Sequence, residues 1–390
     1  MATTSPQAER PPLWRDLRVL KVLAQVVAVG AAAVLVYVVW FNLTNNLAAR
    51  GLSLGFDFLD EPFGVPVAGS DFSPGSAIWR ALIVGLQNTF ALVVVGLPLV
   101  TVVGVLVGIG RLSTNWLVAK ASGFYVEALR NTPPLLVIFF AFNAVILQLP
   151  QIAEPIDLFG LVIINNRFIA VASLSNVEGS GVFWAVAAVA LFLAVIVWVW
   201  RSRRFDRIGS PHHRVVWSLG VLVGIVLAAY LALGGPVEIS HPELEGRVLT
   251  GGISGLAAYF AMLAALVLYT ASHVAEIVRG SILAVPKGQT EAANALALSG
   301  FQRLRHVVLP QAMRIAIPPV ISQYLNYTKN TSLGIAVGYT EFTLIAFQAI
   351  GNGQPAPQLI LLVMLGYLAF SLVISALVNM LNRRLQFVTR

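Results

Sequence analysis

Long runs of apolar residues separated by polar segments dominate the hydropathy pattern of the chain. Positions 22–41 form the first run, in which Gln25 is the only strongly polar residue. A stretch of about 20 apolar residues is long enough to cross the hydrocarbon core of a bilayer as a helix. Further runs of this kind follow, so the sequence predicts eight transmembrane spans: 22–41, 82–110, 122–148, 182–200, 215–234, 253–278, 315–340 and 357–381.

The first run follows a basic segment that ends at Arg18 and Lys21, an order of features that a cleaved signal peptide shares. The apolar region of a signal peptide is only about 7 to 15 residues long and ends at a small-residue cleavage site. The segment that follows here, NLTNNLAAR, resembles such a site only loosely. The pattern therefore favours a retained first span.

Composition strengthens the membrane interpretation. Only 11% of the 390 residues are charged, whereas 58% are hydrophobic, and a soluble domain carries roughly 25% charged residues. The predicted fold class is therefore all-α and polytopic. The chain contains no cysteine, which excludes disulfides, zinc-thiolate sites and thiol nucleophiles.

Charge orients the predicted spans. If the N-terminus is cytoplasmic, the inside segments hold 19 of the 25 Lys and Arg residues but only 5 of the 17 acids. This positive-inside pattern accounts for the net charge of +8 without a nucleic-acid surface. Outside loops receive most acids, including Glu178 and Glu341, which leaves Glu127 as the only clear acid within a span. The densest basic cluster, RSRRFDR at 201–207, is interpreted as a topology anchor that contacts lipid headgroups.

The cytoplasmic segment 280–310 is too polar to span a membrane. Thr290 is expected to cap a two-turn helix, EAANALAL, with Glu291 at its positive end and Ser299–Gly300 as its stop. A helix this short is marginal in water, so its order must come from packing against another surface. The residues between Gly300 and Pro310 are expected to lie along the membrane surface.

The chain shows no catalytic or metal-binding motif. Its lysines do not belong to a GxxxxGK[ST] loop, so we expect no ATP hydrolysis here. The histidines form no metal-ligand pattern, and no nucleophile lies at motif spacing from a base, so neither a resident cofactor nor an enzyme is expected. His273 and Glu276 are candidates for a proton relay, but pairing of Glu276 with Arg279 at i+3 is favoured.

A polar stripe occupies one face of the seventh span. Five polar side chains fall within an arc of about 120°: Ser322, Gln323, Asn326, Lys329 and Asn330. A lysine deep in a span costs roughly 2.5 to 3.5 kcal/mol, so Lys329 is expected to face a carboxylate or a wet cavity. We predict that the stripe lines a translocation path or a seam between membrane subunits. A purely structural hydrogen-bond network is the alternative.

Two proline pairs, Pro133–Pro134 and Pro318–Pro319, are each expected to bend a span. Just before the first pair lie three further candidates for the path: Arg130, Asn131 and Thr132. An ion pair between Glu127 and Arg130 is the favoured interpretation of those two charges. Another polar cluster is expected to form interhelical hydrogen bonds: Gln87, Asn88 and Thr89.

The stretch from Glu291 to Pro310 resembles the EAA signature of membrane subunits of ATP-binding-cassette (ABC) importers. That signature reads EAA, three residues, Gly, nine residues, Ile-x-Leu-Pro; here Ala297 takes the place of the Gly. The segments RGSILAVPKGQTEAA, LPQAMRIAIPPVISQYLNYTKNTSLGIAVGY and ALRNTPPLLVIFF are similar to polar amino acid permeases. Length and extra spans resemble the large permease subunits of general L-amino acid ABC importers.

The resemblance implies a type I ABC importer transmembrane fold, with its conventional core at about 82–148 and 253–381. The span 22–41 and the helical pair at 182–234 are additions to that core. The segment 280–310 would hold a coupling helix that docks into an ATPase. The residues implied in coupling are Glu291, Ala292, Ala293, Ala297, Gly300, Leu309 and Pro310.

The resemblance also implies partners. These are cytoplasmic ATPases that bind ATP and magnesium, a second permease subunit or a copy of this chain, and a periplasmic amino-acid-binding protein. Amino acids would cross the bacterial inner membrane by alternating access, with both chain termini in the cytoplasm. Two other classes stay open on the residues alone: a stand-alone secondary transporter, which predicts an inverted repeat and intramembrane acids, and a lipid-anchored scaffold without a path.

Overall fold

The computed structural model describes residues 14, 16–49, 51, 54–176, 180–208, 213–246 and 248–385. Within these ranges six helices are long and apolar enough to span a membrane, and two bent helix pairs raise the number of spans to eight. The mostly helical fold and the eight spans agree with the prediction. The six long helices are α1 (Leu17–Ala49), α2 (Ile78–Gly110), α5 (Ser180–Ile208), α6 (Arg214–Ala232), α7 (Ala257–Leu283) and α12 (Ala356–Leu385).

The predicted span 122–148 is not one straight helix. It begins earlier, as α3 (Trp116–Arg130), and continues as α4 (Pro134–Phe140), a π turn η2 (Ala141–Val145) and a 3-10 turn η3 (Ile146–Gln148). The helix direction changes by 107° between the two halves of the span. Pro133 and Pro134 supply no amide hydrogen and force the preceding residue out of the helical region. The bend expected at this proline pair is therefore confirmed.

The seventh span is longer than predicted. It runs through α9 (Gly300–Arg303), a π turn η4 (Leu304–Val308), α10 (Leu309–Asn330) and a 3-10 segment η5 (Thr331–Val337). A 45° bend separates it from α11 (Phe342–Gly351). The residues between Gly300 and Pro310, expected to lie along the membrane surface, are continuous with the helical segment of this span. α10 runs through Pro318–Pro319 without a break.

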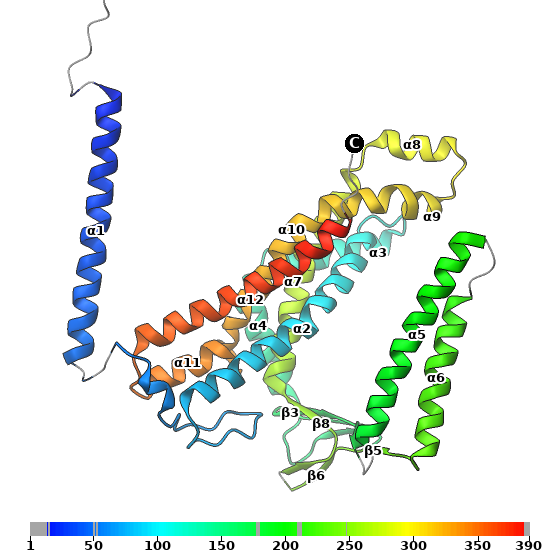
Figure 1. Cartoon of the computed structure of the whole chain (residues 1–390), viewed down its shortest axis with the longest axis horizontal. Helices are drawn as coiled ribbons and strands as arrows, with labels where there is room; N and C mark the ends of the chain where they lie inside the picture. Colours follow the sequence, from blue (N-terminus) through cyan, green and yellow to red (C-terminus); the bar gives the residue numbers. More distant parts are fainter. Residues whose placement is uncertain are drawn as a thin grey trace, which may run out of the picture.

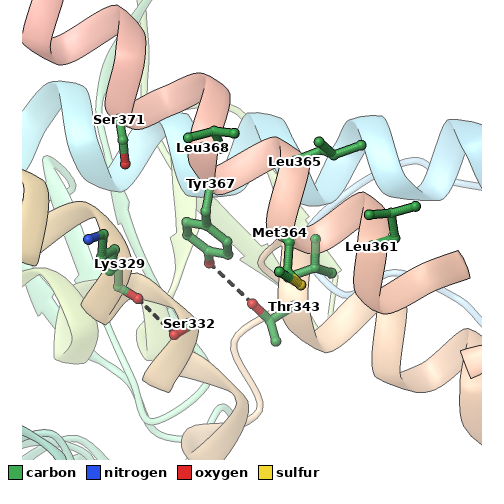
Figure 2. A pocket seen from close by; sticks show the side chains of 10 residues that line it. Lys329, Ser332, Thr343, Leu361, Met364, Leu365, Tyr367, Leu368 and Ser371 are labelled. Atoms are coloured by element: carbon green, nitrogen blue, oxygen red, sulfur yellow. Dashed lines mark hydrogen bonds between the residues drawn. The ribbon is translucent and has the colours of Figure 1, made fainter. Parts of the chain in front are cut away.

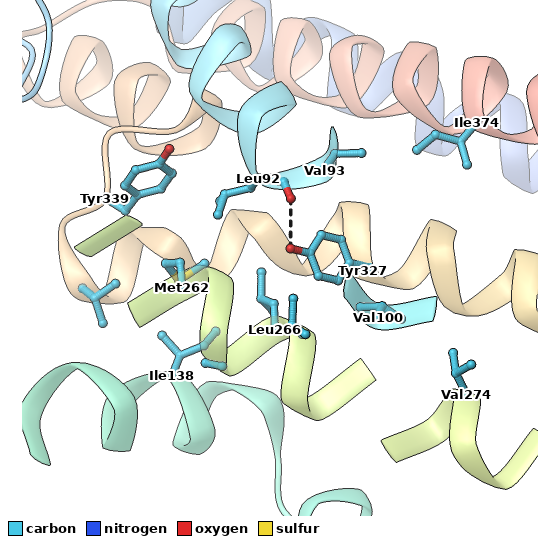
Figure 3. Close-up of a cluster of buried hydrophobic side chains, with 13 residues drawn as sticks. Leu92, Val93, Val100, Ile138, Met262, Leu266, Val274, Tyr327, Tyr339 and Ile374 are labelled. Carbon is cyan, nitrogen blue, oxygen red and sulfur yellow. Dashed lines mark hydrogen bonds between the residues drawn. The ribbon is translucent and has the colours of Figure 1, made fainter. Parts of the chain in front are cut away.

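Packing of α2 against α7 forms the centre of the bundle, with α10 beside them. Buried side chains from these helices and from α4 make one apolar cluster, which includes Leu92, Ile138, Met262, Leu266 and Tyr327. Figure 3 shows the Tyr327 hydroxyl pointing at the backbone of α2, where it donates to the Leu92 carbonyl at 3.0 Å. This bond satisfies the one polar atom of a fully buried ring.

Close approach of α2 and α7 depends on glycines. Gly104 and Gly108 lie four residues apart on α2, and a methyl group on Gly108 would lie 2.7 Å from the Ala275 carbonyl oxygen. Small residues at this spacing let two membrane helices touch along their backbones. The GVLVG sequence thus sets the distance between the central helices.

Substituting Gly108 by alanine is expected to lower the free energy of unfolding by about 1 to 3 kcal/mol, because the methyl group overpacks the contact. Thermal unfolding of the purified protein in detergent would measure this. Gly123→Ala in α3 is the control, since nothing lies within 4 Å of its added methyl group. Equal unfolding midpoints for the two variants would contradict the assignment.

Short strands form in two of the segments between spans, at 156–176 and 237–256. A four-stranded antiparallel sheet has the order β1 (Ile156–Leu158), β2 (Val162–Ile164), β3 (Phe168–Val171) and β8 (Ile253–Leu256). Two further pairs complete the layer: β4 (Ser173–Asn176) with β5 (Val237–Ser240), and β6 (Glu243–Glu245) with β7 (Val248–Thr250). Because β8 ends at Leu256, the sixth span starts at Ala257 rather than at 253. Strands of only three or four residues show too short an alternation of apolar and polar positions to be detected in the sequence.

α5 and α6 pack against each other as a hairpin that stands beside the bundle, and α1 stands on the opposite side (Figure 1). The strands gather at one end of the molecule, and α8 (Lys287–Ala295) lies at the other. A 3-10 turn η1 (Asp57–Asp60) follows α1 at the strand end of the molecule. Glu178, assigned to an outside loop, lies outside the described residues.

Candidate functional site

The predicted coupling helix forms, but with different ends. α8 starts at Lys287, directly after Pro286, and ends at Ala295. Thr290 therefore lies inside the helix and is not its N-cap, so that prediction was wrong. Pro286 ends the preceding helix and leads into the new one. Glu291 lies in the middle of α8, where the charge of a helix end acts only weakly.

Ala297 adopts a left-handed conformation, with φ of 56°. The amide of Ala297 donates to the Asn294 carbonyl and the amide of Leu298 to the Ala293 carbonyl. These two bonds make the Schellman motif, whose left-handed residue is usually glycine because it has no Cβ. The position at which the EAA signature has Gly is thus the C-terminal cap of α8.

Replacing Ala297 by glycine is expected to stabilise the protein by about 1 kcal/mol, because the left-handed conformation penalises a Cβ by that order. Thermal unfolding in detergent provides the measurement. Ala295→Gly, at the last residue of α8, should act in the opposite direction, since glycine weakens a helix by about 1 kcal/mol. A destabilised Ala297→Gly variant would contradict this account of the cap.

The residues predicted to act in coupling divide into an exposed group on α8 and a group that joins α8 to the bundle. Glu291 and Ala292 are exposed, whereas Ala293 is 2% exposed. Arg303 Nη1 donates to Asn294 Oδ1 at 2.7 Å and joins α8 to α9. Gly300 is the first residue of α9, and Leu309 and Pro310 open α10. The sequence reasoning missed Leu296, which is 75% exposed directly after the helix.

The polar stripe on α10 faces outward from the chain. Ser322, Asn326 and Lys329 are exposed, and Gln323 and Asn330 are partly exposed. In the part of the chain that the structure describes, none of the five side chains makes a hydrogen bond to another helix. The hydrogen-bond network that was the alternative is absent from these residues.

Lys329 is the stripe residue that lines a cavity. An open pocket of about 650 Å³ lies between the end of α10 and α12. Figure 2 shows Lys329 at one side, with Ser332, Thr343 and Tyr367 at the polar part of the wall and apolar α12 side chains opposite. No carboxylate among the described residues lies within ion-pair distance of the lysine. Lys329 was expected to face either a carboxylate or a wet cavity, and in the structure it lines a cavity.

Glu341 is a buried acid that the sequence analysis placed in an outside loop. Its carboxylate caps α11 by accepting from the amides of Thr343 and Leu344, each at 2.9 Å. The Tyr367 hydroxyl donates to the same carboxylate at 2.7 Å. Glu341 is fully buried, so Glu127 is not the only acid inside the spans. The sequence offered one signal for this cap: Glu341 directly precedes the apolar run FTLIAF, and acids are favoured at the start of a helix.

A second polar region lies toward the α8 end of α7. Glu276 forms ion pairs with Arg111, at the end of α2, and with Arg279, whose Nη2 lies 2.6 Å from its carboxylate. The favoured Glu276–Arg279 pair is confirmed. The relay to His273 is not formed, because its Nδ1 faces the Tyr269 carbonyl at 3.1 Å.

The predicted Glu127–Arg130 ion pair is wrong, since these two side chains, both described, do not lie within ion-pair distance of each other. Glu127, Arg130 and Asn131 instead line a pocket of about 360 Å³ together with Arg111 and Glu276. The Thr132 hydroxyl donates to the carbonyl of Ala128 at 2.8 Å. Arg130 and Asn131 therefore line the same pocket. This pocket shares no lining residue with the pocket at Lys329.

Interhelical hydrogen bonds by the polar cluster on α2 are confirmed for two of its members. Asn88 Nδ2 donates to the Thr340 carbonyl at 2.7 Å, and the Phe342 amide donates to Thr89 Oγ1 at 3.2 Å. These bonds hold α2 against the bend before α11.

Residues 188–387 match the family of binding-protein-dependent transport system inner membrane components. The chain belongs to this family. It is therefore a multi-pass membrane component of an ABC importer, and not a stand-alone transporter. An ABC importer works with an ATPase and a binding protein, so the chain is one subunit of a larger assembly.

Three relatives within this family cover nearly the whole chain. The general L-amino acid transport permease AapQ of Rhizobium johnstonii is 38% identical over 92% of this chain and 90% of its own length. The putative amino-acid ABC transporter permease YhdX of Escherichia coli is 36% identical over 94% of each chain. The glutamate/glutamine/aspartate/asparagine permease BztB of Rhodobacter capsulatus is 33% identical over 90% of this chain and 91% of its own.

Solved ABC transporters are also similar to this family member. A crystal structure of an amino acid ABC transporter with histidines has a TM-score of 0.45 and 17% identity, covering 78% of this chain and 94% of the other. An inward-facing MetNI methionine ABC transporter has a TM-score of 0.43 and 14% identity, covering 80% and 98%.

Proposed function

We propose that this chain is the permease subunit through which an ABC importer moves L-amino acids across the bacterial inner membrane. The observation that carries the proposal is the full-length similarity to amino acid permeases, 38% identical over 92% of the chain in one case. The coverage of 92% of this chain and 90% of the relative means that the similarity is not confined to one part of the bundle.

Energy would come from a separate ATPase that docks on α8. The exposed side of this helix carries Ala292, Ala295 and Leu296, small or apolar residues at the end of the molecule opposite the strands. Such a surface suits burial in a groove of another protein, because it offers apolar area with little side-chain entropy to lose. The strand end would then face the periplasm and a binding protein, and both chain termini would lie in the cytoplasm.

The translocation path would pass Lys329. Lys329 lines a pocket of about 650 Å³ and has no described carboxylate within ion-pair distance, and every amino acid brings a carboxylate that can complement its charge. The open side of this pocket, between α10 and α12, would be closed by a second permease subunit or by a copy of this chain. The pocket at Arg130 and Asn131, toward the α8 end, would lie on the route to the cytoplasm.

Reconstitution tests this proposal. Vesicles are prepared with the chain, its ATPase, its partner permease and a binding protein. They should accumulate labelled L-amino acids only when ATP is present on the side of the membrane to which the ATPase is bound. Vesicles without the ATPase serve as the control and should take up none. Uptake by the chain alone, without ATP, would overturn the proposal.

A further inference from the structure

The ends of α5 and α6 nearest α8 carry a cluster of arginines stacked on tryptophan rings. The Arg201 guanidinium lies 5.0 Å from the ring centroid of Trp217, and that of Arg214 lies 4.7 Å from Trp198. Each of these stacks crosses from one helix to the other. Arg214 Nη1 also donates to Ser202 Oγ at 3.2 Å. The two helix ends are thus joined by reciprocal cation–π contacts.

A third stack lies within α5, where the Arg204 guanidinium is 5.5 Å from the Trp200 ring. Arg203 and Arg204 are exposed. The partners that the structure gives to Arg204 and Arg214 are rings and a hydroxyl, none of which carries a negative charge.

Stacking leaves the hydrogen-bonding edge of an arginine available. The ring contacts the flat face of the guanidinium, while its N–H donors lie in the plane and point away from the ring. Two in-plane N–H groups match two oxygens of a phosphate in a bidentate contact. The ring contacts themselves use no N–H donor, and the hydrogen bond to Ser202 uses one donor of Arg214, so the other donors are left to bind a phosphate.

The surroundings of the cluster suit a lipid rather than a dissolved anion. Trp rings concentrate at the level of lipid headgroups, where one edge is wet and the other apolar. Exposed apolar side chains continue from the cluster along both helices, among them Ile196 and Phe192 on α5 and Leu219 and Val223 on α6. An acyl chain lying there would cover apolar surface while its phosphate met the arginines.

From this geometry we propose that the α8-side end of the α5–α6 hairpin binds the phosphate of an anionic phospholipid in the inner leaflet. The hairpin stands beside the bundle (Figure 1), so a lipid held at its end would occupy the space next to it. The proposal does not rest on the transported substrate and holds whatever solute crosses the bundle.

The test is a titration of the detergent-purified complex with short-chain phosphatidylglycerol, followed by native mass spectrometry. Arg204→Gln with Arg214→Gln should weaken the tightest phosphatidylglycerol binding about 30-fold, because each basic residue near an anionic headgroup contributes roughly a factor of five. The matched control, Arg18→Gln with Lys21→Gln, removes two exposed charges from the start of α1 and should leave this binding unchanged.

Parallel titrations use short-chain phosphatidylcholine and inorganic phosphate. Equal binding of the two lipids, or equal losses in the two double variants, would overturn the proposal. Binding of inorganic phosphate as tight as that of phosphatidylglycerol would assign the cluster to a free anion and also overturn it. If the glutamine pair does not fold, Arg204→Lys with Arg214→Lys keeps both charges and removes the planar donors, and it should still weaken phosphatidylglycerol binding relative to the control.

Discussion

Substituting Lys329 by methionine is expected to reduce ATP-dependent amino acid uptake by about 100-fold, since losing one partner of a desolvated charge pair costs roughly 2 to 5 kcal/mol. Lys329 lines the pocket between α10 and α12, and no described carboxylate lies within ion-pair distance of its ammonium group. In the proposed path the missing partner is the substrate carboxylate. Uptake of labelled amino acid into reconstituted vesicles is the measurement.

Methionine has a similar length and removes a cation whose insertion costs roughly 2.5 to 3.5 kcal/mol, so the variant should assemble at least as well. Size-exclusion chromatography of the purified complex checks assembly. Lys21→Met, near the start of α1, serves as the control and should transport normally. Unchanged uptake by a fully assembled Lys329→Met complex would remove Lys329 from the path.

Substituting Leu296 by aspartate is expected to weaken association with the ATPase by more than about 100-fold, because an unpaired charge buried in an interface costs roughly 3 to 5 kcal/mol. Leu296 is 75% exposed directly after α8, so its side chain buries little surface within this chain. Co-purification of tagged permease with the ATPase measures the loss, and ATP-dependent uptake should fall with it.

Thr114→Asp is the matched control for this prediction. Thr114 is exposed in the turn between α2 and α3, so the variant adds the same charge to the same end of the molecule outside the coupling segment. The ATPase should remain bound to it. If Leu296→Asp also retains the ATPase, the docking surface does not include the end of α8.

The spans could be predicted from the sequence because each is a long apolar run, and length alone identifies a helix that crosses a bilayer. The bend at Pro133–Pro134 could also be predicted, since proline acts on its own backbone. The ends of α8 could not. Thr290 has the side chain of a cap, yet Pro286 upstream started the helix earlier, so the stronger local signal prevailed.

Contacts between distant segments were the part that the sequence did not reveal. Glu276 and Arg279 are one helical turn apart, and their pairing was predictable, but Arg111 reaches the same carboxylate from another helix. Glu341 was assigned by its place after a span, whereas its burial depends on Tyr367 in α12. Neighbouring charges such as Glu127 and Arg130 did not pair, because proximity in sequence does not decide which partner lies nearer in space.

The unbroken helical segment from Gly300 to Val337 has a mechanical consequence. At 1.5 Å per residue, Lys329 lies about 44 Å along this rod from its start. The Arg303–Asn294 hydrogen bond joins α8 to this rod. In the proposed assembly, a rotation that the ATPase applies to α8 would be carried along the length of the rod. A tilt of only about 5° about the near end would swing the lysine sideways by roughly 4 Å, more than the length of one hydrogen bond.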